Sequence, residues 1–163
     1  MSLHAWLGLA MVVVNLLAGV IGAIAWWRVE PSRPFWPLLR AGQLLSVVVA
    51  AHGGVLYAQG DEVPDLHLIY GLMPLGIAFV AEQLRLTSAQ TVLDQRGLES
   101  SQAVAALPER QQRSIVLAIV RREIGVMAAS ALVITLLALR AAGWLCQPPR
   151  QAPTASRNNA AQG

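Results

Sequence analysis

Long stretches without a charged residue are the feature that most constrains how this chain can fold. Residues 1–27 and 41–60 contain no Asp, Glu, Lys or Arg, and shorter charge-free runs follow at 66–81 and 124–139. A helix needs about 20 apolar residues to cross a hydrocarbon core of roughly 30 Å. The two shorter runs reach that length only if flanking arginines extend their charged groups to the interface. We therefore predict an all-α fold, a bundle of four transmembrane helices. The spans are expected at about 5–27, 38–58, 66–86 and 123–145.

The composition agrees with lipid as the main solvent. Hydrophobic residues make up 55% of the chain and charged residues 13%, and there is one cysteine. These proportions exclude an intrinsically disordered chain and a disulfide-stapled secreted domain. Tryptophan and tyrosine lie close to the expected span boundaries, where their rings favour the headgroup level. No catalytic motif stands out, so we expect a protein that is not an enzyme.

The arginines predict the orientation of the chain. All twelve basic residues are arginine. Nine lie in the first and third connections between spans and three on the C-terminal side, whereas the second connection carries only Asp61, Glu62 and Asp65. Because positive charge is retained in the cytoplasm, both termini are expected outside the plasma membrane. No positive charge precedes the first apolar run, which favours an uncleaved anchor over a signal peptide.

The third connection, 87–122, is expected to contain an amphipathic cytoplasmic helix before the fourth span. Pro108 suits the first position of a helix. Ile115 and Ile119 then project onto one side and arginines onto the other. We expect this helix to lie on the membrane surface and to bend near Gly125 into the fourth span. Its basic face is predicted to meet anionic lipid headgroups or a cytoplasmic protein partner. The residues proposed for that contact are Arg110, Arg113, Arg121 and Arg122.

The domain organisation follows from these spans. Residues 1–146 are expected to form one transmembrane domain. Residues 147–163 are rich in Pro, Gln, Ala and Asn without apolar periodicity, so we predict a disordered tail. The arginines are spread over several loops rather than clustered among aromatics, which argues against nucleic-acid binding.

Polar and small residues inside the spans predict how the helices pack. Small residues such as Gly22 on one stripe of the first span allow close helix contact. The second span, with Gln43 and Ser46 on one face, is expected to be the partner of two other spans. Glu82 and Arg85 have the spacing of a helical ion pair, and Arg40 should lie at the same level.

All three histidines, His4, His52 and His67, fall in the outer leaflet under this topology. Neutral imidazole is a good ligand for haem iron, copper or zinc, so these residues form a candidate cofactor or metal site. Asp65 is placed to orient the ring of His67. His52 fits less well, because it projects about 180° from Gln43 on its helix. No CxxC or HxxxH motif supports the site.

Three segments carry a resemblance to a known family. They are 31–43 (PSRPFWPLLRAGQ), 65–71 (DLHLIYG) continuing to 81–85 (AEQLR), and 107–113 (LPERQQR) leading into 121–125 (RREIG). Together they resemble a small four-span integral membrane family of actinobacteria and related high-GC bacteria that has no assigned activity, over roughly residues 1–145. His52 and the segment 66–71 are also similar to haem-binding four-helix bundles such as half of a haem A synthase, although that family's other histidines and glutamate motif are missing.

Two functional hypotheses remain. The first is a non-enzymatic membrane interaction or accessory subunit whose arginine-rich inner loop meets lipid or a partner. The alternative is a haem- or metal-binding membrane protein that uses His4, His52 and His67. An oligomeric transporter or channel is disfavoured because the spans contain no deep acidic group. Homo-oligomerisation is left open.

Overall fold

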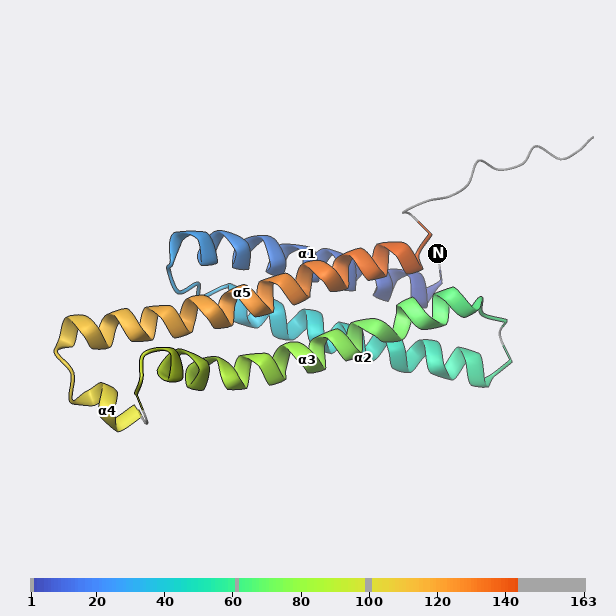
Figure 1. Ribbon diagram of the computed structural model, residues 1–163. Coiled ribbons are helices and arrows are strands. Elements are labelled where there is room, and N and C mark those ends of the chain that lie inside the picture. Colours follow the sequence, from blue (N-terminus) through green and yellow to red (C-terminus); the bar gives the residue numbers. More distant parts are fainter. Residues whose placement is uncertain (1, 61, 99–100, 144–163) are drawn as a thin grey trace, which may run out of the picture.

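Four long helices dominate the computed structural model of this chain, which describes residues 2–60, 62–98 and 101–143 (Figure 1). The elements are α1 (Leu3–Arg28), α2 (Phe35–Ala58), α3 (Asp65–Gln95), α4 (Ser101–Ala105) and α5 (Glu109–Ala141). Within these described ranges there is no strand, so the predicted all-α class is confirmed. The expected tail at 147–163 lies outside the described residues.

Helices α1, α2, α3 and α5 are long and apolar enough to cross a membrane, as predicted from the charge-free runs. The shortest of them, α2, has 24 residues and spans about 36 Å at 1.5 Å per residue, which exceeds a typical hydrocarbon core. Large apolar side chains such as Leu16, Val20 and Phe79 are 44–66% exposed on the outside of the bundle. Exposed surfaces of this kind suit a lipid environment, in which outward-facing apolar side chains carry no cost.

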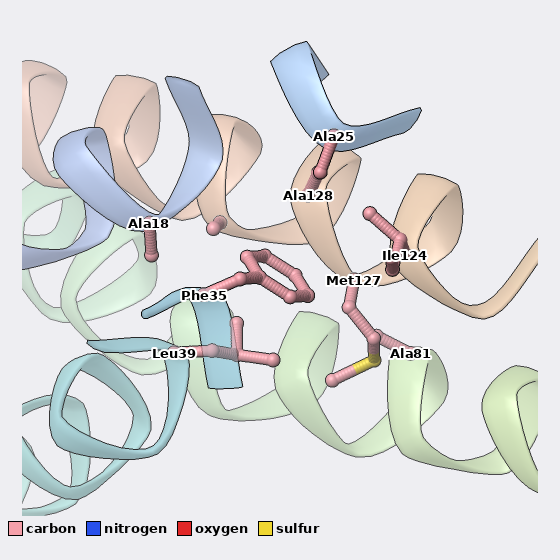
Figure 2. Close-up of a cluster of buried hydrophobic side chains, with 9 residues drawn as sticks. Ala18, Ala25, Phe35, Leu39, Ala81, Ile124, Met127 and Ala128 are labelled. Atoms are coloured by element: carbon pink, nitrogen blue, oxygen red, sulfur yellow. The ribbon is translucent and has the colours of Figure 1, made fainter. Parts of the chain in front are cut away.

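Helix α5 holds the bundle together because it packs along both α1 and α3. Helix α2 packs mainly against α1 and less against α3, so the second span has the two partners expected of it, while α5 is the most shared helix. One buried apolar cluster joins all four long helices, and Figure 2 shows the ring of Phe35 at its centre. Its members are Ala18, Ala25, Phe35, Leu39, Ala81, Ile124, Met127, Ala128 and Ala131.

Small residues permit this close packing, as their stripes on the first and fourth spans predicted. A Cβ atom added to Gly22 of α1 would lie 2.4 Å from the Phe35 ring and 2.7 Å from the Cβ of Ala128. A Cβ added to Gly42 of α2 would lie 2.8 Å from the side-chain oxygen of Asn15. Asn15 itself is fully buried, and its Nδ2 donates to the backbone oxygens of Met11 (2.9 Å) and Gly42 (3.3 Å).

The third connection differs from its prediction. Helix α3 continues to Gln95, and α5 runs without interruption from Glu109 through Gly125, so the expected surface helix and the fourth span are one helix (Figure 1). Gly125 has another role, since a Cβ there would lie 2.8 Å from the Trp26 ring. Ile115 is only 2% exposed and packs with Val92 and Leu93 of α3, rather than facing lipid. The apolar face of this segment therefore forms a small protein core.

Replacing Gly22 by alanine should destabilise the bundle, although alanine is the better helix former. The added methyl group overlaps the Phe35 ring and Ala128, and overpacking of this kind costs about 1–3 kcal/mol. Gly76→Ala is the matched control, because its Cβ meets nothing within 4 Å. Thermal unfolding of the purified chain in detergent should show a lower midpoint for Gly22→Ala and an unchanged or higher one for Gly76→Ala. Equal midpoints would contradict this packing.

Candidate functional site

The three histidines lie together at one end of the bundle, which we call the histidine end. There α1 and α3 begin and α2 and α5 finish, so the antiparallel order of the helices brings distant parts of the sequence together (Figure 1). The His4 ring stacks on the His52 ring with 5.5 Å between centroids. The His67 ring is tilted by 56° to that of His4, with centroids 6.0 Å apart. Each of the three side chains is partly buried.

His4 and His52 are joined through their Nδ1 atoms, which lie 3.4 Å apart. A hydrogen bond between them requires one Nδ1 to donate and the other to accept. His52 thus contacts α1, while Gln43, which projects about 180° from it around the axis of α2, donates from Nε2 to Glu82 of α3 (2.9 Å). Helix α2 has neighbours on two sides, so opposite faces of it are both used. The projection that set His52 apart from Gln43 overlooked this arrangement.

His67 has a fixed orientation. Its Nδ1 donates to the backbone oxygen of Ala141 (3.0 Å), in the last turn of α5, where carbonyl groups have no partner within the helix. Because a carbonyl oxygen can only accept, Nδ1 carries the proton, and Nε2 of the neutral ring keeps a free lone pair. Asp65 was expected to orient this ring, but the backbone of α5 does so instead.

An apolar cavity of about 400 Å³ opens beside these rings, within the range of small-molecule sites. His4 and His67 line it together with Tyr57 and Tyr70, and most of the remaining lining is aliphatic or glycine. Gly8, Gly54 and Gly71 face it from three different helices, and a Cβ at any of them would meet nothing within 4 Å. The cavity therefore depends partly on the missing side chains of these glycines.

The three histidines lie near one another but do not form a metal site as they stand. Among the described residues, no three His, Cys, Asp or Glu side chains are already placed to hold a metal ion. Two nitrogens bound to one tetrahedral Zn²⁺ at about 2.0–2.1 Å would lie about 3.4 Å apart. The Nδ1 atoms of His4 and His52 have that spacing. His67, whose ring centroid is 6.0 Å from that of His4, is the candidate for the third ligand.

A second group of polar side chains lies between α2 and α3. Glu82 forms ion pairs with Arg40 and with Arg85 (3.1 Å), which confirms the predicted helical pair and adds Arg40 to it. Arg40 also donates to Gln43 Oε1 (2.6 Å), and the Arg85 guanidinium lies 5.5 Å from the centroid of the Trp36 ring. The carboxylate therefore balances two guanidinium groups, as an ionisable cluster in a membrane-crossing helix requires.

The opposite end of the bundle, which we call the arginine end, gathers the four arginines that the sequence singled out. Arg110, Arg113, Arg121 and Arg122 line one open hollow of about 660 Å³. Arg96 lines it too, as does Trp26 of α1, whose ring centroid is 4.9 Å from the Arg121 guanidinium. Sequence reasoning missed these two contributors because Trp26 comes from α1 and Arg96 from the segment after α3, although Arg96 belongs to the same basic connection.

Comparison with known proteins adds no assignment to this geometry. No model of a protein family, no curated protein and no solved structure matches the chain.

Changing Glu82 to glutamine should destabilise the bundle, because the guanidinium groups of Arg40 and Arg85 would lose the carboxylate that they share. We expect a loss of about 1–3 kcal/mol in unfolding free energy, the usual cost of leaving such groups unpaired. Glu30→Gln removes the same charge from an exposed position and serves as the control. Unfolding in detergent should separate the two variants. If Glu82→Gln unfolds at the same point as Glu30→Gln, the cluster has no stabilising role.

Proposed function

We propose that this chain is a non-enzymatic membrane accessory protein that binds a single transition-metal ion through His4, His52 and His67, or haem through one or two of these imidazoles. One observation carries the proposal: the only three histidines of the sequence come from three helices and meet beside an apolar cavity. Imidazole coordination of a metal is the chemistry that haem and a free ion share.

His67 is the best prepared ligand of the three. Its Nδ1 is held by a backbone carbonyl, which is the usual outer partner of a metal-bound histidine, and this leaves Nε2 to coordinate. His4 and His52 would supply their Nδ1 atoms, and the metal would replace the proton that joins them. The apolar cavity supports the haem alternative, in which at most two imidazoles would bind the iron, whereas all three histidines could serve a lone ion.

We also propose that the histidine end faces outward and the arginine end faces the cytoplasm. The support is the excess of arginine in the first and third connections. A site at the outer face would give an accessory protein access to metal or haem outside the cell.

Ligand binding can be tested on the purified full-length chain in detergent, loaded separately with haem, Cu²⁺ or Zn²⁺. We expect either a Soret band or one equivalent of metal, reduced at least about tenfold in His67→Ala because a primary ligand is lost. Tyr57→Phe is the control, since it changes the cavity wall without removing an imidazole. Gly71→Leu distinguishes the two forms: it should fill the cavity and block haem while sparing a bare ion. Absence of both signals would overturn the proposal.

Orientation can be tested by labelling single cysteines in intact cells with a membrane-impermeant maleimide. In a Cys146→Ser background, Glu62→Cys lies between α2 and α3 at the histidine end, and Ser114→Cys lies at the arginine end. Both positions are exposed. Glu62→Cys should label in intact cells and Ser114→Cys only after permeabilisation. The reverse pattern would place the histidine end inside.

A further inference from the structure

The open hollow at the arginine end is a second site, independent of the histidines. It is lined by five arginines, by Trp26 of α1, by Val29 directly after α1, and by small and apolar residues of α5. Arg110, Arg113 and Arg121 recur along one face of α5, and Arg122 follows directly. Arg96 reaches the hollow from the segment after α3. The site therefore draws on three parts of the chain.

In the part of the chain that the structure describes, none of the hollow's five arginines forms an ion pair with a carboxylate. The carboxylate of Glu82 pairs with Arg40 and Arg85, and no carboxylate lies within 4.0 Å of the five arginines of the hollow. Several guanidinium groups that share one concave surface repel one another and concentrate positive potential there. An anion in the hollow would relieve that repulsion.

Arginine also suggests which anion fits. The planar guanidinium presents parallel N–H groups that match two oxygens of a phosphate group, and its charge persists at any physiological pH. Because all the cations of this hollow are arginine, a phosphate group is a better match than a single spherical ion. The volume of about 660 Å³ leaves room for a whole headgroup.

The surroundings of the hollow indicate a lipid rather than a soluble phosphate. Trp26 stacks against Arg121, and the neighbouring Trp27 is 78% exposed, as expected for rings at the headgroup level of a membrane. Leu117 and Ala118 of α5 line the hollow beside the arginines, so apolar side chains lie next to the cationic groups.

We propose that this hollow binds the phosphate headgroup of an anionic phospholipid, with Arg110, Arg113 and Arg121 contacting the phosphate and Trp26 packing against the glycerol region. The site differs from a general attraction to negatively charged membranes, because it uses a defined set of cations. It gives the arginine end a fixed position relative to the headgroups.

The test measures lipid retention on the purified full-length chain by native mass spectrometry. The chain is delipidated and then titrated with phosphatidylglycerol or with zwitterionic phosphatidylcholine. We expect saturable binding of phosphatidylglycerol and none of phosphatidylcholine. The double variant Arg113→Gln/Arg121→Gln should weaken phosphatidylglycerol binding by at least about tenfold, since each arginine near a membrane surface contributes a substantial share of the affinity.

The control is Arg28→Gln/Arg33→Gln, which removes the same charge from the same end of the bundle but from residues that do not line the hollow. It should bind phosphatidylglycerol like the unchanged chain, and Arg121→Lys should be weakened because it keeps the charge without the planar contact. If the control variant loses as much phosphatidylglycerol binding as the double variant, the binding is a diffuse electrostatic attraction and the proposal is wrong. Competition by millimolar inorganic phosphate as effective as lipid would identify a soluble anion and also overturn it. The unfolding midpoint of each variant in detergent establishes that it is folded.

Discussion

Close packing of α5 against both α1 and α3 is the constraint on which the rest of the structure depends. Lipid tails are as apolar as the side chains of these helices, so the hydrophobic effect does not drive the helices together. Helix association must therefore come from close contact between complementary surfaces. Alanines of α5 and glycines of α1 provide that fit around Phe35. This packing places the last turn of α5 against α3 at the histidine end and the first half of α5 at the arginine end.

The two ends of the bundle use α5 in different ways. At the histidine end the Ala141 carbonyl, in the last turn of α5, accepts a hydrogen bond from His67. A helix terminus thus sets the orientation and the tautomer of a candidate ligand. At the arginine end its exposed face carries most of the cations of the hollow, while its buried face packs Ile115 on α3. One rigid helix therefore fixes both candidate sites, which are separated by the apolar core.

Several features were predictable because they depend on local sequence or on composition alone. The number of long helices follows from charge-free length, and the small-residue stripe of α1 from helical periodicity. The Glu82–Arg85 pair follows from its spacing of three residues.

Other predictions were wrong for a shared reason. The bend expected at Gly125 treated that glycine as a local breaker, although its missing side chain makes room for Trp26 of a different helix. Ile115 was assigned to lipid because apolar periodicity cannot tell lipid from protein.

The sequence by itself determined that this chain forms long apolar helices and which ends of them carry histidine or arginine, because charge, length and periodicity act within each segment. Tertiary structure alone decided that His52 reaches His4, that the Ala141 backbone rather than Asp65 holds His67, and that Arg96 and Trp26 complete the hollow of α5. Those contacts join residues far apart in the chain, and their existence depends on which faces of neighbouring helices meet. Helix packing sets those faces, and no single segment encodes it.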